Sequence, residues 1–548
     1  MNRRTLIKQL GLSMPAYLLL KQPGLFSTDN QEEQYAKGPF QPTWDSLQNY
    51  SVPEWYRNAK FGIWAHWGPQ CEPEYGDWYA RGMYQEGSHQ YKYHLEKYGH
   101  PSKFGFKDVI HQWKAEKWDP ESLVALYKSA GAKYFFAMAN HHDNIDLWDS
   151  KYQSWNSKNA GPKKDIISGW SKAAKKQGLP FGVSVHASHA WSWFEVSQRA
   201  DKNGPLAGVP YDGKLTKQNG MGTWWEGMEP QELYAQDHIL SENSLDNNTI
   251  HKQWNWGNGV TPPSKAYCDK FQKRVFDLID KYEPDLLYFD DTVLPFYPIN
   301  DVGLQIAAHH YNQNIKRNRG NLEAVLNGKI LNEIQRKCMV WDIERGQSNA
   351  IETFAWQTDT CIGDWHYNKN VYENKTYKTA KTVIQMLADI VSKNGNLLLN
   401  IPVKGNGTID DQELAILGEI TDWMKLNSEC IYDTRPWKIF GEGPAISDAA
   451  PVKAQGFNEG KNKPYGPADI RFTTKGETLY AIVFGWPDNG VVKINSLSDG
   501  NVLRPGPVNR VELLGGGNLS FQRSTTALEV RLPEVKAALS YAIVLKIS

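Results

Sequence analysis

Two adjacent histidines and an aspartate, His141, His142 and Asp143, close an apolar, aromatic-rich run that follows Gly131. A short run of this composition predicts a fully buried strand. Neighbouring side chains of a strand point to opposite faces, so one imidazole can face a pocket while the other supports it. Taken alone, such a pair would be interpreted as two hydrogen-bonded core histidines.

The same arrangement occurs at two other places in the chain. The apolar run 60–65 ends in His66, and the run 286–289 ends in the carboxylates of Asp290 and Asp291. Titratable groups that follow several buried strands meet at one place in only a few folds, notably those with parallel strands. The recurrence therefore indicates an enzyme.

The elements that would position these groups form a repeating pattern. Predicted helices cover residues 119–130, 165–177, 267–282 and 379–393, and an apolar strand-like run follows each of them. This alternation implies parallel strands with crossover helices. A (β/α)8-type barrel is the most economical solution for about 400 residues, with the active site at the carboxyl ends of its strands.

A doubly wound α/β sheet is the alternative to the barrel. That fold normally offers a glycine-rich phosphate loop, and the sequence contains none. The barrel interpretation places the side chains of four strand ends in one site. These are His66, His142, His186 and Asp290.

The pattern changes after Trp437. Gly, Pro, Asn and Asp clusters separate short β-rich segments, which is typical of an antiparallel β-sandwich. We therefore expect a catalytic barrel over residues 35–436 and a C-terminal sandwich of structural role over residues 437–548. The predicted strands of the sandwich are residues 479–484, 491–495, 510–514, 527–532 and 541–545.

The amino terminus predicts export. Arg3 and Arg4 precede a modest apolar run over residues 10–20, as in a twin-arginine signal, so residues 1–30 are interpreted as a signal and linker. This run is too short to cross a bilayer as a mature helix. We therefore expect a periplasmic or extracellular protein with no membrane association in its mature form.

The composition narrows the function classes. The 61 acidic and 61 basic residues balance, so no basic surface for nucleic acid is expected. The 22 Trp and 27 Tyr suit a carbohydrate cleft, where sugar faces stack on rings, although they also fill large cores. The five cysteines are too few and too scattered for a disulfide framework or a structural zinc site, so no metal is expected. The oligomeric state is not predictable from these features.

Four segments together resemble the α-L-fucosidase family, glycoside hydrolase family 29. They are residues 60–68, 130–150, 284–290 and 391–400, and they occur in the family's order. The resemblance implies a barrel with a C-terminal β-sandwich and a retaining hydrolase that acts on a glycan and needs no cofactor. The implied substrate is a glycan that carries terminal α-L-fucosyl residues.

The resemblance also implies roles for individual residues. Asp290 matches the family's nucleophile, and Asp291 is its competitor because the two side chains face opposite ways. A retaining glycosidase also needs an acid/base carboxyl group about 5–5.5 Å from the nucleophile. The residues expected to contact the sugar are His66, Trp67, His141, His142 and His186.

The acid/base lies in the segment 340–360. In relatives the catalytic glutamate precedes a tryptophan by roughly a dozen residues, which favours Glu344 over Glu352 when Trp356 is that tryptophan. Trp356 is accordingly expected to lie beside the sugar. Arg345 is expected to pair with the nucleophile or with an acidic group of the substrate.

Two departures from the family leave alternatives open. Gln357 stands where many relatives have glutamate, which keeps a catalytically inactive carbohydrate-binding barrel in view. His186 and His189 stand where relatives often read Tyr-Tyr-Ser, and an insert follows with Trp224 and Trp225, which could form a stacking wall. These polar substitutions leave room for an α-L-galactosidase, because L-galactose is fucose with a hydroxyl on C6.

Overall fold

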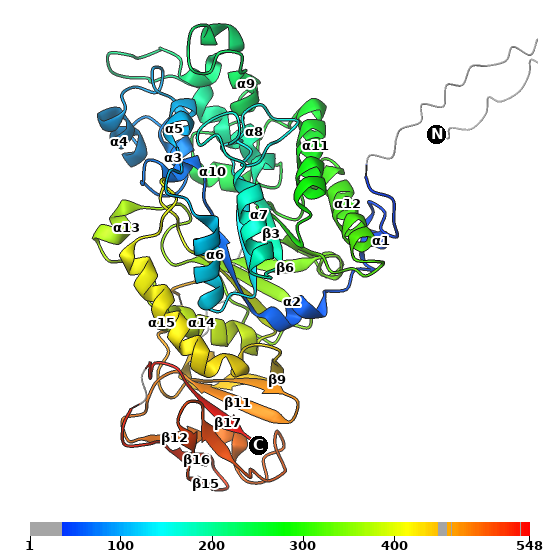
Figure 1. Cartoon of the computed structure of the whole chain (residues 1–548), viewed down its shortest axis with the longest axis vertical. Coiled ribbons are helices and arrows are strands. Elements are labelled where there is room, and N and C mark those ends of the chain that lie inside the picture. Colours follow the sequence, from blue (N-terminus) through cyan, green and yellow to red (C-terminus); the bar gives the residue numbers. More distant parts are fainter. Residues whose placement is uncertain (1–34, 448–457, 462, 537–538) are drawn as a thin grey trace, which may run out of the picture. The chain divides into compact units, whose positions relative to one another are not determined.

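A computed structural model describes residues 35–447, 458–461, 463–536 and 539–548 (Figure 1). The predicted export signal lies outside these residues. None of the helices within the described ranges has the length and apolarity that a membrane span requires.

Eight parallel strands close into a barrel, in which β8 pairs with β1. The predicted fold class is confirmed. The strands are β1 (Phe61–Ala65), β2 (Tyr134–Asn140), β3 (Phe181–Val185), β4 (Leu286–Phe289), β5 (Val325–Gly328), β6 (Val340–Glu344), β7 (Trp356–Cys361) and β8 (Gly395–Asn400).

The four predicted helices are present with clear boundary signals. Asp119 caps the first of them by accepting hydrogen bonds from two backbone N–H groups, and Gly131 follows its end with a φ of +105°, which a side chain would disfavour. The helices that cover the barrel are α2 (Glu54–Ala59), α6 (Pro120–Ser129), α7 (Ile166–Lys176), α11 (Lys265–Tyr282), α12 (Val302–Arg317), α14 (Ala380–Ser392) and α15 (Asp411–Asn427).

Two long excursions leave the barrel at the carboxyl ends of its strands, one after β1 and one after β3. Figure 1 shows their short helices close together, and Arg81 of the first excursion donates hydrogen bonds to Asn247 and to the Ser244 carbonyl of the second. The helices are α3 (Tyr79–Gly82), α4 (His89–Lys97) and α5 (Phe106–Gln112), followed by α8 (Ala190–Trp193), α9 (Pro230–Leu233) and α10 (Asn247–Lys252).

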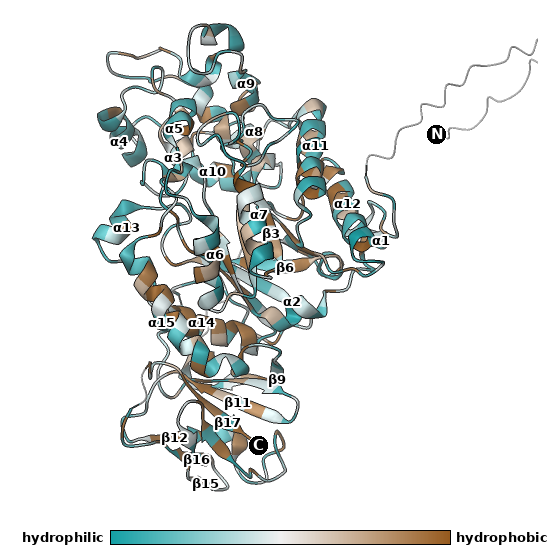
Figure 2. Ribbon diagram, viewed as in Figure 1, coloured by the Kyte–Doolittle hydropathy of each residue, from teal (hydrophilic) through white to brown (hydrophobic). Residues whose placement is uncertain are grey.

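The barrel interior is partly polar. The Gln357 side chain accepts a hydrogen bond from the Tyr56 hydroxyl at 2.9 Å and donates one to the Asp342 carboxyl group at 2.8 Å. Hydrogen bonds of this kind are what allow polar groups to be buried. Figure 2 shows hydrophobic residues concentrated on the strands, whereas α4 is largely hydrophilic.

The C-terminal region forms two antiparallel sheets with their own hydrophobic core. Five of its strands match the predicted ones. The first strand of the region, β9, is not among those five and begins at Arg435, close to the expected boundary. The six-stranded sheet has the order β14-β13-β17-β11-β10-β9 and the other β12-β16-β15. The bounds are β9 (Arg435–Glu442), β10 (Ile470–Lys475), β11 (Thr478–Val483), β12 (Val491–Ile494), β13 (Val511–Leu513), β14 (Gly517–Asn518), β15 (Phe521–Arg523), β16 (Leu528–Arg531) and β17 (Ile543–Ile547).

Candidate active site

A cavity of about 370 Å³ opens at the carboxyl ends of the barrel strands. Histidines, carboxylates and aromatic rings form most of its wall, which suits a small polar ligand with apolar faces. The lining residues are Trp64, His66, Asp77, Trp78, His89, Gln90, His141, His142, His186, Asn247, His251, Trp254, Tyr288, Asp290, Lys329, Glu344, Arg345, Asp359, Trp365 and His366.

Asp290 follows β4 and is surrounded by donors. Its Oδ2 lies 3.0 Å from His142 Nε2 and 3.0 Å from His186 Nδ1, and its Oδ1 lies 2.5 Å from the Lys329 ammonium. Burial alone would raise the pKa of Asp290, but the Lys329 ammonium and the two imidazoles hold it well below its usual range. The carboxylate is therefore ionised and oriented, as a nucleophile requires.

The two imidazoles that contact Asp290 are fixed on their other sides. His142 lies between two acceptors, with Nδ1 2.8 Å from the His186 carbonyl oxygen and Nε2 3.0 Å from Asp290 Oδ2. His186 Nε2 lies 3.1 Å from the Ser184 hydroxyl, which can donate to it while Nδ1 donates to Asp290. Burial lowers the pKa of His186 to about 4, so this ring is neutral near pH 7.

Glu344 ends β6 and shares the same ammonium. Its Oε2 lies 2.5 Å from Lys329 Nζ, and its side chain remains 17% exposed toward the cavity. Because Lys329 lies 2.5 Å from oxygens of both carboxylates, those two oxygens are no more than about 5 Å apart. Burial alone would lower the pKa of Lys329, but the carboxylates of Asp290 and Glu344 raise it well above its usual value.

Asp291 points away from this group. Its carboxylate accepts a hydrogen bond from the Ser188 hydroxyl at 2.8 Å and lies 3.1 Å from His189 Nε2. Asp291 does not line the cavity, because consecutive side chains at a strand end face opposite ways. Asp291 therefore contacts Ser188 and His189 behind the cavity wall and supports the loop that carries Asp290.

Trp67 and Trp356, which were expected at the sugar, lie elsewhere, and so does Glu352, the alternative acid/base. The indoles of Trp67 and Trp356 are buried outside the cavity and donate to the carbonyls of Lys404 and Lys393. Trp67 faces away from the cavity because it alternates with His66, and Trp356 begins β7 at the end opposite the site. Glu352 is held by the Ser348 hydroxyl and Arg336, away from the cavity.

Arg345 lines the cavity but does not pair with Asp290. Its guanidinium lies 3.2 Å from the Glu459 carboxylate, and Lys329 takes the expected place beside Asp290. Its backbone has a φ of +47°, which is unusual for a residue other than glycine. Strain of this kind often lies next to functional groups, and Glu344 immediately precedes it.

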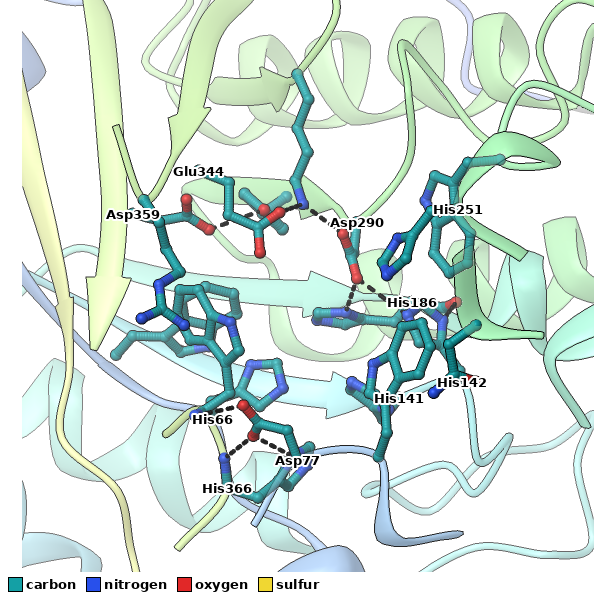
Figure 3. Close-up of a pocket in the computed structure, with 18 of the residues that line it drawn as sticks. His66, Asp77, His141, His142, His186, His251, Asp290, Glu344, Asp359 and His366 are labelled. Carbon is teal, nitrogen blue, oxygen red and sulfur yellow. Dashed lines mark hydrogen bonds and ion pairs between the residues drawn. The ribbon is translucent and has the colours of Figure 1, made fainter. Parts of the chain in front are cut away.

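His66 and His366 lie across the cavity from Asp290 and Glu344, together with Asp77 (Figure 3). The His141 ring lies between the two sides, with its centroid 4.9 Å from that of His366 and 5.0 Å from that of His186. Burial holds the pKa values of His66 and His141 well below their usual range, so both rings are neutral. Neutral imidazoles in an enclosed wall can donate to or accept from sugar hydroxyls.

Two groups of three histidines could in principle hold a metal ion. Within the described ranges, ring nitrogens of His66, His141 and His366 lie within 4.8 Å of one another, as do those of His141, His142 and His186. Hydrogen bonds compete with ligation, because His141 Nδ1 lies 2.8 Å from the Gln70 amide and both His142 and His186 contact Asp290. The arrangement therefore suits hydroxyl recognition better than a metal.

The insert reaches the cavity through residues that the sequence did not single out. Trp224 donates to Asp108 and Trp225 is buried, both away from the cavity, whereas His251 and Trp254 line it. His251 stacks on Trp78 with 5.0 Å between ring centroids. This aromatic group provides a stacking surface beside Asp290 and Glu344.

Asp359 on β7 is a further buried carboxyl group. It accepts a hydrogen bond from the Tyr288 hydroxyl at 2.9 Å. Burial raises its pKa well above the usual range, and the like charges of Asp342 and Glu344 raise it further. The raised pKa favours the protonated form of Asp359, which lines the cavity.

Two family models match the chain. The model described as "Alpha-L-fucosidase" matches residues 27–429, and "Alpha-L-fucosidase C-terminal domain" matches residues 465–548. Among curated proteins, human tissue alpha-L-fucosidase is 24% identical over 502 residues, covering 88% of this chain and 86% of that protein. The alpha-L-fucosidase of Branchiostoma floridae is 25% identical over 485 residues, covering 87% of each.

Solved structures show the same fold. The Thermotoga maritima alpha-fucosidase in complex with fucose has a TM-score of 0.66 at 24% identity, covering 93% of this chain and 100% of that one. A trapped covalent intermediate of a family 29 alpha-L-fucosidase from Bacteroides thetaiotaomicron has a TM-score of 0.56 at 16% identity, covering 94% and 99%.

Proposed function

The chain belongs to the α-L-fucosidase family and is a glycoside hydrolase, and we propose that it is a retaining exo-glycosidase that removes terminal α-L-fucosyl residues from glycans. The observation that carries this proposal is the separation of the two carboxylates. Oxygens of Asp290 and Glu344 lie no more than about 5 Å apart, which is nearer to the spacing of a retaining glycosidase than to the wider spacing of an inverting one.

In the first step an Asp290 oxygen attacks the anomeric carbon, and Glu344, when protonated, gives its proton to the departing glycosidic oxygen. Asp290 becomes a neutral ester, while Glu344 becomes a carboxylate that Lys329 can stabilise. In the second step Glu344 removes a proton from water, and the water oxygen displaces Asp290 from the sugar. Because the Lys329 ammonium contacts both residues, it can stabilise the Asp290 carboxylate before the attack and the Glu344 carboxylate after it.

An aryl α-L-fucoside tests this proposal. The purified protein should hydrolyse it, and NMR of the first-formed product should show the α anomer because two inversions retain configuration. A folded protein that gives no turnover would instead support the inactive binding barrel. Gln357 does not favour that alternative, because it lies inside the barrel on Tyr56 and Asp342 rather than at the cavity.

An α-L-galactoside is the second candidate substrate, and the polar groups in the cavity wall support it. The cavity wall holds the Tyr288 hydroxyl and the buried carboxyl group of Asp359, either of which could bind a hydroxyl on C6. A wall built for the fucose methyl group would be apolar there and would reject the extra hydroxyl only about 10–200-fold. Comparing kcat/KM for matched aryl fucoside and galactoside decides between them.

We also propose that the protein is exported to the periplasm or beyond, on the support of Arg3, Arg4 and the apolar run that follows. Replacing both arginines with lysine should leave the protein in the cytoplasm. Cell fractionation would measure this, and unchanged export of the double variant would contradict the proposal.

A further inference from the structure

We propose that His366 is a specificity-determining residue of this enzyme, whose imidazole binds a hydroxyl at the C3–C4 end of the sugar. The proposal rests on the proposed function, since it concerns the same cavity. It adds a contact that neither the sequence pattern nor the family resemblance indicated.

The backbone around His366 is fixed at the cavity edge. Trp365 and His366 lie in the loop after β7, and the Asp77 carboxylate accepts hydrogen bonds from both of their backbone N–H groups, at 3.2 and 2.7 Å. The Asn400 side chain donates to the Trp365 carbonyl at 2.9 Å. The Asp77 and Asn400 side chains thus hold the backbone of this loop, and neither of them uses a ring nitrogen of His366 in these hydrogen bonds.

The ring itself has no direct hydrogen bond. His366 is 1% exposed, and neither of its nitrogens has a hydrogen-bond partner within the residues that the structure describes. The same holds for His66, whose ring centroid lies 4.7 Å away. Burying polar groups without partners is unfavourable, so both rings gain when a ligand supplies partners.

The tautomers of His366 and His141 together provide one acceptor and one donor for a hydroxyl group. His366 Nδ1 lies 3.5 Å from the Asp77 carboxylate, which favours a proton on Nδ1 and leaves Nε2 as an acceptor. His141 has the opposite arrangement. The Gln70 amide donates to its Nδ1, because the Gln70 oxygen already accepts from Ala80 N–H, so His141 Nε2 carries a proton. One hydroxyl could therefore donate to His366 and accept from His141.

The position of the histidines identifies the sugar carbons. Figure 3 shows His66 and His366 across the cavity from Asp290 and Glu344. The anomeric carbon must lie beside Asp290 for attack. In a six-membered sugar ring C4 lies opposite C1, and C3 and C5 are the next farthest carbons. Because C5 of fucose carries a methyl group, the hydroxyls that face the histidines are those on C3 and C4.

Three aryl α-L-fucosides test the assignment: the parent, its 3-deoxy analogue and its 4-deoxy analogue. His366→Phe keeps a planar ring and removes both nitrogens. We expect this variant to lose about 10–100-fold in kcat/KM on the parent, as for one or two buried hydrogen bonds. On one of the two deoxy analogues the variant should lose less than threefold, because the contact is already absent.

Two controls keep the result specific. His310→Phe removes a buried imidazole outside the cavity, one that lies 3.2 Å from the Val325 carbonyl, and it should affect all three substrates equally. His366→Asn retains a hydrogen-bonding side chain and should recover part of the loss. Thermal unfolding checks that each variant is folded.

An equal loss by His366→Phe on the parent and on both analogues would overturn the inference while leaving the proposed function intact. If the wild-type protein turned over none of the three substrates but hydrolysed another glycoside, the proposed function itself would fail. The two failures are therefore distinguishable.

Discussion

Lys329 is the residue that sets the charge of the reacting pair. Its ammonium is buried, and it contacts both Asp290 and Glu344 at 2.5 Å. A buried ammonium between two carboxylates is stable only while they remain paired with it. The ionisation of the nucleophile therefore depends on this one side chain more than on the surrounding histidines.

Replacing Lys329 with methionine should shift the acid limb of kcat/KM to higher pH. Asp290 must be ionised to attack, and its pKa now lies well below the usual range. Without the ammonium, burial dominates and raises that pKa, so activity is lost as pH falls through the raised value. A pH–rate profile measures this, and Lys329→Arg, which keeps the charge, is the control. An acid limb that does not move in the methionine variant would contradict this role.

The proton donor is tested by leaving groups. Glu344→Gln should slow substrates with poor leaving groups about 10²–10⁴-fold and slow activated aryl substrates far less. Glu352→Gln is the matched control, because Glu352 lies outside the cavity and should give a nearly unchanged profile. Exchanged results for the two variants would show that the wrong glutamate had been assigned.

At the scale of elements, the polarity of a strand decided how much of the site could be predicted from sequence. Strands β1 to β4 and β8 are apolar runs, so they were predicted with the groups that follow them. Strands β6 and β7 carry Asp342, Gln357 and Asp359 in a polar network inside the barrel, and the apolar residues of β5 end at Leu326, before Asn327 and Gly328. Without an apolar run there was no strand to predict, and Lys329 and Asp359 were missed with it.

The position of a residue relative to its strand also explains why His366 was not predicted and why Trp67 and Trp356 were placed wrongly. His366 follows β7 in a loop. Its backbone N–H donates to Asp77, which lies in the excursion after β1 and is far from His366 in the sequence. Trp67 and Trp356 matched family motifs, but a motif does not state which face of a strand each residue occupies. Alternation of side chains places both in the core instead.

The loop after β6 is held by a segment of the C-terminal region. Glu459 lies 3.0 Å from the Thr360 hydroxyl and 3.2 Å from the Arg345 guanidinium, and its backbone N–H donates to the Arg345 carbonyl. Arg345 directly follows Glu344, and its left-handed backbone is stable only if its surroundings hold it. We therefore propose that this segment positions Glu344.

Replacing Glu459 with glutamine should slow poor leaving groups by about tenfold and activated ones less, because misplacement of Glu344 affects protonation first. The measurement is kcat/KM across aryl fucosides of graded leaving-group pKa. Glu529→Gln is the control, because Glu529 lies on β16 of the C-terminal sheets and pairs with the exposed Lys493. An identical leaving-group dependence in the Glu459 variant and the wild type would show that this contact does not position Glu344.

At the scale of the described molecule, the barrel and the C-terminal sheets share buried contacts. Arg471 of β10 pairs with Asp389 of α14 at 2.6 Å, and the Trp423 indole of α15 donates to the Ala542 carbonyl at 2.7 Å. Asp389 also contacts the Lys393 ammonium at 2.6 Å, so this buried charged group joins α14 to the sheets. Together with Glu459, these contacts give the C-terminal region a supporting role in the enzyme.

The central claim is that Asp290 forms a covalent bond with the sugar. Asp290→Ala should abolish turnover of an aryl α-L-fucoside while thermal unfolding shows a folded protein, because the covalent step is lost. Added azide should restore part of the activity and yield a fucosyl azide of inverted, β configuration, identified by NMR. Normal turnover by the variant, or an azide product of α configuration, would contradict the account.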